Sequence, residues 1–419
     1  MIQRQLSQWL QKVISRPQIV HIFGLRQTGK TTLMNEFRKN INGHLHYPFQ
    51  DYIILNKYQS DIALWISEIQ EALRRVGEKE KLHVFVDEVQ KIPDIFQALQ
   101  GLYDEHKGRI KFWIWGSSAR PLKKHRAETL AGRFISRILH PLSQAEIFKK
   151  QTMLPVLLQL PGSLLDISYS QPSNYNRFLS NCLRHTLLPE PFLIDDEDAV
   201  DDLLESYQAS YLENEIRREN LVSDIGIFSR YLVLSASENT ETANYSSFAK
   251  DLGVSSNTIK TYFDILKDTF IATHLQPYSK RLRVQISKSP KNYFADAGLA
   301  HFVAGHRSVP AQQTSWFGKL FEAFVYNEIV KQVEYNHLPW KLTFCRTKTG
   351  READLIISNG TVSVAVEIKA KSRIDAKDYE DLQYMMSLDA SISHGVVISL
   401  QGAPLQLDDK IFNFPVWNL

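Results

Sequence analysis

The stretch that decides the fold of the N-terminal part is Ile19-Val20-His21-Ile22-Phe23-Gly24-Leu25-Arg26-Gln27-Thr28-Gly29-Lys30-Thr31. Its second half is a complete G-x-x-x-x-G-K-[ST] motif, the phosphate-binding P-loop. The apolar run before the motif predicts a strand, and Leu33, Met34 and Phe37 after it predict an amphipathic helix. The strand–loop–helix context favours nucleotide binding over a chance match.

The chemistry of ATP binding explains the spacing of this motif. Gly24 and Gly29 let the backbone bend, so that successive N–H groups point at the phosphates. The helix that begins near Lys30 adds its positive dipole end. Lys30 reaches the β- and γ-phosphates, and the Thr31 hydroxyl ligates Mg²⁺. We therefore expect ATP and Mg²⁺ as cofactors, with contacts from Gly24, Gln27, Thr28, Gly29, Lys30, Thr31 and Thr32.

Two further strand ends supply the groups that hydrolysis requires. The apolar run from Leu82 ends in Asp87 and Glu88. Asp87 is predicted to hold Mg²⁺, and Glu88 to polarise the attacking water as general base. The alternative is an acidic turn after a strand. The next strand ends in Gly116 and Ser117, and Ser117 is predicted to contact the γ-phosphate or the water.

The order of apolar patterns predicts a multidomain α/β protein. Its length of 419 residues suggests two to four domains. The predicted divisions are an α/β domain with a parallel sheet at 1–145, a helical region at 146–235, a winged helix-turn-helix at 236–305 and a second α/β domain at 306–419. The strands expected in the first domain are 19–23, 52–55, 83–86, 111–115 and 135–139. An acidic run between Asp195 and Asp202 predicts a linker or a helix start.

Bulk properties exclude several classes. Hydrophobic residues make up 43% and charged residues 23%, which is typical of a globular chain. The net charge of +3 means that nucleic-acid binding needs local basic patches. The two cysteines have no zinc-ligand spacing and fit a reducing compartment. Without a signal-like N-terminus or a run of roughly 18 apolar residues, we expect a cytoplasmic protein that does not enter a membrane.

These residues resemble the AAA-type ATPases, and in particular a prokaryotic group that joins such a domain to a C-terminal restriction-endonuclease-like domain. The segments that carry the resemblance are Gly24–Thr31, Asp87-Glu88, Gly116-Ser117-Ser118, Leu130–Phe134 and Lys288–Leu299. In AAA-type enzymes an arginine just before the fifth strand completes the site of a neighbouring subunit. Arg133 has that place, with Arg137 and Arg120 as substitutes, so the resemblance implies a homo-oligomer. The alternative is a surface arginine.

Residues 245–267 predict a helix-turn-helix. One helix carries Phe248 and ends at Gly253, and a second is capped by Ser255 or Ser256. The residues expected on the buried face of the second helix are Ile259, Tyr262, Phe263 and Leu266, whereas Asn257, Lys260, Thr261 and Lys267 lie elsewhere. A basic stretch follows with Lys280, Arg281, Arg283, Lys288 and Lys291, and we interpret it as a surface wing that contacts phosphate. A winged helix that contacts DNA, or one that packs between domains, fits this pattern.

Two apolar segments around Asn359-Gly360 predict a hairpin, from Glu352 to Ile357 and from Thr361 to Lys369. A two-residue turn would place Asp354 opposite Ala365 and diagonal to Glu367, with the carboxylates roughly 5–8 Å apart. Carboxylates at that separation could bind Mg²⁺ between them. The alternative is a hairpin with one charged, solvated face.

Asp354 followed by Glu367-x-Lys369 resembles the restriction-endonuclease core. The family pattern adds a carboxylate on a preceding helix, which Glu322 matches. The resemblance implies that Glu322, Asp354 and Glu367 are metal ligands and that Lys369 is a catalytic base or electrophile.

Two functions follow from these motifs. In the first, ATP hydrolysis positions the winged helix and the nuclease-like domain on DNA. In the second, ATP drives a molecular switch whose C-terminal modules only bind partners, such as a protein. The complete set of Glu322, Asp354, Glu367 and Lys369 favours the first function, which we prefer, whereas the small net charge favours the second.

Overall fold

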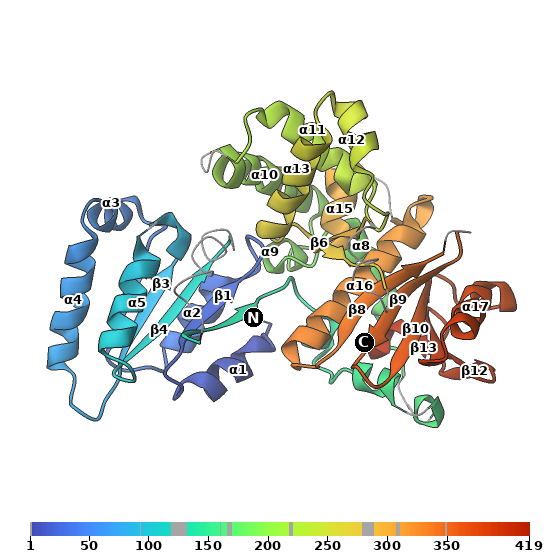
Figure 1. Ribbon diagram of the computed structural model, residues 1–419, viewed down its shortest axis with the longest axis horizontal. Helices are drawn as coiled ribbons and strands as arrows, with labels where there is room; N and C mark the ends of the chain where they lie inside the picture. The colour runs from blue at the N-terminus through green and yellow to red at the C-terminus, as the bar shows by residue number, and fades with distance from the viewer. Residues whose placement is uncertain are drawn as a thin grey trace. The chain divides into compact units, whose positions relative to one another are not determined.

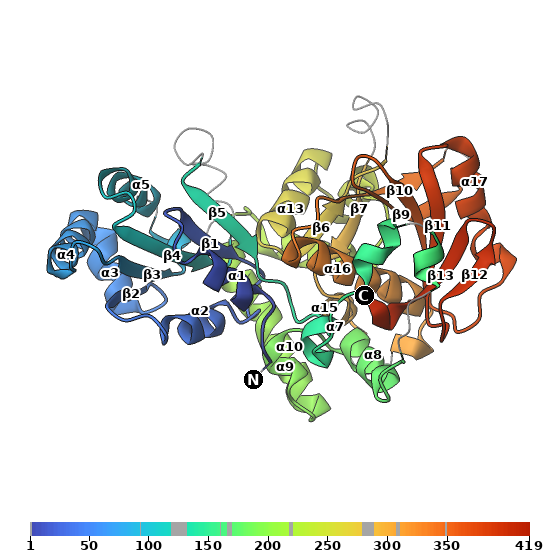
Figure 2. The same cartoon turned by 90° about the horizontal axis from the view of Figure 1, so that it is seen from below.

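The computed structural model describes residues 2–92, 94–118, 132–159, 161–165, 170–217, 221–278, 289–306, 311–347 and 350–419. They form two compact units. The first comprises Met1–Pro141 and Asp268–Phe270, and the second comprises Leu142–Lys267 and Ile271–Leu419. Figure 1 labels the helices and strands, and Figure 2 shows them from a second side. None of the helices in these described ranges is long and apolar enough to cross a membrane.

A five-stranded parallel sheet forms the centre of the first unit. Its strands are β1 (Ile19–Phe23), β2 (His44–Pro48), β3 (Leu82–Asp87), β4 (Ile110–Gly116) and β5 (Phe134–Ile138), in the order β2-β3-β4-β1-β5. β1 and β4 are buried throughout, as expected for strands covered on both faces. Because all neighbouring strands are parallel, the carboxyl ends of β1, β3 and β4 lie along one edge of the sheet.

Helices surround this sheet. They are α1 (Leu6–Val13), α2 (Lys30–Arg38), α3 (Tyr52–Ser60), α4 (Ile62–Arg75) and α5 (Ile95–Glu105), with a short 3₁₀ turn η1 (Val89–Lys91) after β3. Figure 2 shows α2 on one side of the sheet and α5 on the other. The core includes Trp65 of α4, whose ring centroid lies 6.4 Å from that of Phe112 on β4. The four strands predicted near β1, β3, β4 and β5 are confirmed.

The strand predicted at 52–55 is wrong. The structure has helix α3 there, and the second strand is β2. The Asp51 carboxylate accepts hydrogen bonds from the Ile53 and Ile54 amides at 2.8 and 3.2 Å, so it caps the helix. Tyr52 and Ile53 are 74% and 78% exposed, so these apolar residues do not belong to the core.

The second unit begins with a helical region. Its elements are α7 (Gln144–Phe148), 3₁₀ turns η2 (Leu154–Leu158) and η3 (Pro161–Leu164), α8 (Tyr175–Arg184), α9 (Pro189–Phe192), α10 (Glu197–Tyr211), a π-helical turn η4 (Leu212–Arg217) and α11 (Ile225–Ser237). Asp196 caps α10 by accepting hydrogen bonds from the amides of Asp198 and Ala199. The acidic run is therefore a helix start.

The predicted helix-turn-helix segment forms α12 (Tyr245–Leu252) and α13 (Ser256–Asp268). Gly253 ends α12 in the left-handed region, and the Ser255 hydroxyl accepts a hydrogen bond from the Thr258 amide at the start of α13. The four apolar residues predicted on one face of α13 are all buried. β6 (Ala272–Leu275) and β7 (Lys291–Phe294) then form a two-stranded antiparallel sheet, and α15 (Ala297–Val303) follows.

The C-terminal part is a mixed six-stranded sheet with helices. Its strands have the order β12-β13-β11-β10-β9-β8. The elements are a 3₁₀ turn η5 (Ala311–Gln313), α16 (Phe317–Tyr335), β8 (Lys341–Arg346), β9 (Glu352–Ser358), β10 (Ser363–Lys369), η6 (Ala376–Asp378), α17 (Glu380–Leu388), β11 (Ile392–Ser399), β12 (Leu405–Asp408), β13 (Ile411–Pro415) and η7 (Val416–Asn418).

The β9–β10 hairpin exists, but its predicted register is wrong by two residues. Ser358 pairs with Ser363 and Leu355 with Val366, so the turn has four residues rather than two. The Asn359 side chain accepts hydrogen bonds from the amides of Thr361 and Val362, which stabilises the longer loop. A shift of two residues leaves the faces unchanged. If the pairing is extended by one residue pair beyond Leu355 and Val366, Asp354 lies directly opposite Glu367.

The segment that follows β7 packs closely against α8. A Cβ added to Gly298 of α15 would lie 2.4 Å from the Cys182 carbonyl oxygen and 2.5 Å from the His185 carbonyl oxygen. Both neighbours are backbone atoms, which cannot rotate away. Glycine is therefore required for this contact between two helices.

We predict that Gly298→Ala lowers the free energy of unfolding of the second unit by about 1–3 kcal/mol, because the added methyl group overpacks the contact. The measurement is urea unfolding followed by circular dichroism. Gly318→Ala is the matched control: Gly318 also lies in a helix, and a Cβ there meets nothing within 4 Å. An equal effect of both substitutions would contradict the interpretation.

Candidate functional site

The P-loop lies at the carboxyl edge of the first sheet, directly between β1 and α2. Gly24 has φ +149°, and a Cβ there would lie 2.2 Å from the Leu139 carbonyl oxygen. Gly29, with φ 86°, is the residue before α2. The first turn of α2 therefore presents its backbone amides to the loop, which is the arrangement that binds phosphate.

Lys30 is folded back onto its own loop. Its ammonium donates hydrogen bonds to the carbonyl oxygens of Gly24 at 2.9 Å and Leu25 at 2.8 Å. The side chain is buried. Because phosphate oxygens are stronger, charged acceptors, a nucleotide would draw this ammonium away from the two carbonyl groups.

Thr31 and Asp87 form the part of the site suited to Mg²⁺. The Thr31 hydroxyl donates to Asp87 Oδ2 at 3.0 Å, and the Gln50 amide donates to the same oxygen at 2.7 Å. Asp87 is fully buried, and its Oδ1 is a buried atom with no hydrogen-bond partner among the described residues. Burial, and next the charge of Glu88, raise the pKa of Asp87 to about 6. A buried carboxylate oxygen without a donor fits a hard divalent cation.

Glu88 and Ser117 are joined by a side chain that the sequence analysis missed. The Gln90 amide donates a hydrogen bond to Glu88 Oε2 and another to Ser117 Oγ, the latter at 3.2 Å. Ser117 Oγ also lies 3.3 Å from Glu88 Oε2. Glu88 has φ +50°, the left-handed conformation that is uncommon for residues with a side chain. The predicted base and the predicted sensor are thus held in one hydrogen-bonded group.

Two more residues support the site. The Trp115 indole donates to the Thr31 hydroxyl at 3.2 Å. The Arg4 guanidinium donates to the carbonyl oxygens of Thr28 and His140, both at 2.6 Å, and so connects the P-loop with the segment after β5. Trp115 could have been inferred from its place at the end of β4. Arg4 lies far along the chain from the motif, and nothing in the sequence indicates its contact.

We predict that Gln90→Ala lowers the rate of ATP hydrolysis about 10- to 100-fold while ATP affinity stays unchanged, because the variant loses the group that orients Glu88 and Ser117. Phosphate release and equilibrium binding of a fluorescent ATP analogue measure the two quantities. Gln97→Ala, at an exposed position of α5, is the control. A change in affinity alone would contradict the prediction.

Arg133 lies at the opposite edge of the sheet from its own P-loop. Its carbonyl oxygen accepts a hydrogen bond from Ile19, at the start of β1. Its guanidinium contacts both carboxylate oxygens of Asp104 on α5, at 2.7 and 2.9 Å. Arg137 stacks over Trp9 at 4.9 Å, and Arg120 lies outside the described residues. Arg133 therefore cannot serve its own nucleotide, and its predicted role in a neighbouring subunit stays a prediction.

In the second unit, the carboxylates predicted as metal ligands come close together. Glu322 extends from α16, Asp354 from β9 and Glu367 from β10. Asp354 Oδ2 accepts a hydrogen bond from the Ile368 amide at 2.8 Å, and Glu367 Oε1 pairs with the Lys369 ammonium at 2.6 Å. Burial, and next the charge of Asp354, raise the pKa of Glu322 to about 7. The same two causes raise the pKa of Glu367.

A lysine also lies among these carboxylates. Lys291 Nζ is 3.0 Å from Glu322 Oε1, 2.5 Å from Glu352 Oε1 and 3.7 Å from Asp354 Oδ1. Its side chain is 5% exposed, so the prediction that Lys291 contacts phosphate at the surface is wrong. In the part of the chain that the structure describes, no group of three or more His, Cys, Asp or Glu side chains is placed to hold a metal ion.

The surface of α13 offers a mixed set of side chains. Asn257, Lys260, Thr261 and Lys267 are exposed, as predicted, but Asp264 is exposed as well. The remaining basic residues of the predicted wing, from Lys280 to Lys288, lie outside the described residues. DNA contact by this segment stays a prediction.

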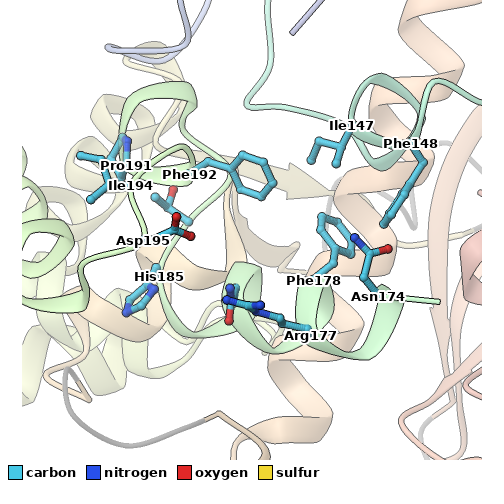
Figure 3. Close-up of a pocket in the computed structure, with 12 residues that line it drawn as sticks. Ile147, Phe148, Asn174, Arg177, Phe178, His185, Pro191, Phe192, Ile194 and Asp195 are labelled. Carbon is cyan, nitrogen blue, oxygen red and sulfur yellow. The ribbon is translucent and has the colours of Figure 1, made fainter. Parts of the chain in front are cut away.

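The helical region contains a cavity of about 290 Å³ that the sequence analysis did not single out. Figure 3 shows the rings of Phe148 and Phe178 together on one side and His185 and Asp195 on the other. The two phenylalanine rings meet edge to face, with centroids 4.9 Å apart. The volume of this cavity is close to the lower limit of about 300 Å³ for small-molecule sites.

Comparison with known proteins agrees with this geometry. Residues 16–148 match the AAA domain family. The matched range contains the P-loop together with Asp87, Glu88 and Ser117. Two families described only as domains of unknown function match the rest of the chain, DUF8612 over residues 179–309 and DUF4143 over residues 317–419.

The relatives that match this chain over most of its length are named only as uncharacterized proteins. An uncharacterized protein of Mycobacterium tuberculosis is 23% identical over 371 residues, which cover 88% of this chain and 74% of that protein. One of Haemophilus influenzae is 23% identical over 296 residues, covering 68% and 69%. Among solved structures, a Walker-type ATPase of Pyrococcus abyssi has a TM-score of 0.44 at 14% identity, covering 72% of this chain and 96% of that one. That TM-score is too low to transfer a property.

Proposed function

We propose that the AAA domain binds ATP with Mg²⁺ and hydrolyses it, and that the reaction acts as a molecular switch for the second unit. The observation that carries this proposal is the Thr31–Asp87 hydrogen bond of 3.0 Å beside the buried Oδ1 of Asp87, which has no hydrogen-bond partner within the described ranges. A hydroxyl and a carboxylate at hydrogen-bond distance support the proposal, because P-loop enzymes hold Mg²⁺ with these two kinds of group.

Each predicted residue has a defined role in this proposal. Lys30 leaves the loop carbonyl groups and neutralises the β- and γ-phosphates, and amides from Gly24 to Thr32 bind phosphate oxygens. Thr31 and Asp87 would hold Mg²⁺, and that ion would neutralise charge on the phosphates. Glu88 takes a proton from the attacking water, and Ser117 orients that water or the γ-phosphate. Gln90 keeps Glu88 and Ser117 in place.

The proposal predicts that Glu88→Gln reduces the turnover number for ATP by about 10²- to 10⁴-fold, because the amide cannot accept the proton. Mg²⁺-dependent ATP binding is retained. Steady-state phosphate release and nucleotide binding are the measurements. Glu71→Gln, at a surface ion pair of α4, is the control and should match the wild type. Full turnover in Glu88→Gln would refute the assignment of the base.

We further propose that Arg133 completes the site of a second copy of this chain. Lys30→Ala and Arg133→Ala should each lose most of the ATPase activity, whereas a mixture of the two should regain part of it. In the mixture, an intact P-loop can meet an intact Arg133 from the neighbouring subunit. Phosphate release at constant total protein measures the recovery. A mixture no more active than the sum of its components would contradict a role in trans.

The second candidate is DNA processing by the α13 region and a metal-dependent nuclease centre. The convergence of Glu322, Asp354, Glu367 and Lys369 favours it. Its minimal requirement is that these carboxylates bind a divalent metal, and the buried Lys291 among them argues against that requirement. The switch is therefore the function that the geometry supports better.

A further inference from the structure

Lys291 is held in place from two directions. It pairs with Leu275 across the β6–β7 sheet and forms a bridge with Thr242 on its other side. Tyr293, two residues further on, donates a hydrogen bond to Glu322 Oε1 at 2.7 Å. Strand β7 thus sends two side chains toward the same carboxylate of α16, so the position of the ammonium is set by the backbone and not by a flexible surface chain.

The ammonium uses the oxygen atoms that a metal would need. Glu322 Oε1 and Asp354 Oδ1, from two of the three predicted ligands, lie 3.0 and 3.7 Å from Lys291 Nζ. A divalent cation prefers carboxylate oxygens at about 2.0–2.6 Å. Two cations cannot share this space in a buried site, where like charges repel strongly. Lysine and metal would exclude each other.

The balance of charges around Lys291 also indicates that this cluster of carboxylates needs the lysine as a counter-ion. Four carboxylates (Glu322, Glu352, Asp354 and Glu367) surround two ammonium groups, Lys291 and Lys369, and the Arg346 guanidinium pairs with Glu352 at 3.5 Å. Removing Lys291 would take the formal charge from −1 to −2 when all groups are ionised. Glu367 is 7% exposed, and its Oε2 has no hydrogen-bond partner among the described residues. Among the described residues, these carboxylates are not placed to hold a metal ion as they stand, so without the lysine their side chains would have to move closer together to take a cation.

We propose that Lys291 is the resident cation of this carboxylate cluster: it occupies the space between the carboxylates that were predicted as metal ligands and keeps divalent metals out while β7 stays in place. The cluster then ties β7 to α16 and β9 through a buried ion-pair network. This goes beyond the ATP-driven switch and does not depend on it, since every residue concerned lies in the second unit.

The test is Mn²⁺ binding by the full chain without nucleotide, measured by electron paramagnetic resonance in a Lys30→Ala background that weakens the P-loop site. In the parent, which carries only Lys30→Ala, we expect no Mn²⁺ site that depends on Asp354. Adding Asp354→Asn to the parent should therefore leave Mn²⁺ binding unchanged. Adding Lys291→Met should create about one Mn²⁺ site per chain, and Asp354→Asn should abolish it. Thermal unfolding should show Mn²⁺ stabilising the Lys291→Met chain only, because a ligand bound to the folded state raises its stability.

Lys319→Met is the matched control. Lys319 pairs with Glu241 at 2.7 Å but is 42% exposed, so its loss should leave Mn²⁺ binding as in the parent. Lys291→Arg, which keeps the charge, should also bind no Mn²⁺. The proposal is overturned if the parent chain binds Mn²⁺ and Asp354→Asn removes that binding. This outcome does not depend on whether a chain substituted at Lys291 folds. It is also overturned if folded Lys291→Met gains no site. Phosphate release reports on the other unit, so either result leaves the ATPase proposal standing.

Discussion

The hydrogen bond from the Thr31 hydroxyl to Asp87 Oδ2 is the contact on which the nucleotide site depends. It joins the first turn of α2 to the end of β3, two segments that only a parallel sheet brings to one edge. Gln50, which lies just after β2, contacts Asp87, and Trp115 of β4 contacts Thr31. The groups suited to Mg²⁺ are therefore in place in this structure, and Lys30 is the group that has to move.

The sequence indicated which side chains of the first unit come together, because these side chains follow the ends of strands. A P-loop after β1, two carboxylates after β3 and a serine after β4 must meet when the strands are parallel. The sequence did not reveal the roles of Gln90 and Arg4 for a physical reason. Each acts through side-chain hydrogen bonds, and the partners of these bonds are set by the folded structure and not by the spacing of residues along the chain. The misplaced second strand shows that one capping carboxylate, Asp51, can turn an apolar run into a helix.

The second unit was predicted less completely. The alternation of apolar and charged residues fixed which residues share a face of the hairpin, and the convergence of Asp354 and Glu367 follows from it. The Asn359-Gly360 pair predicted a two-residue turn and therefore the wrong register. In the structure the Asn359 side chain accepts a hydrogen bond from the Val362 amide and so stabilises a four-residue loop. Lys291 was assigned to the surface since its neighbours in sequence are basic. Its place among the carboxylates comes from β7 pairing with β6, a contact that no local pattern reveals.

The most direct test of the account is a crystal structure of the chain with Mg²⁺ and a non-hydrolysable ATP analogue. The account predicts Lys30 Nζ on the β- and γ-phosphates, away from the Gly24 and Leu25 carbonyl groups. It also predicts Mg²⁺ on the Thr31 hydroxyl with Asp87 beside it, and Glu88 facing the γ-phosphate. Nucleotide bound elsewhere, or Lys30 still on its own loop with the analogue present, would contradict it.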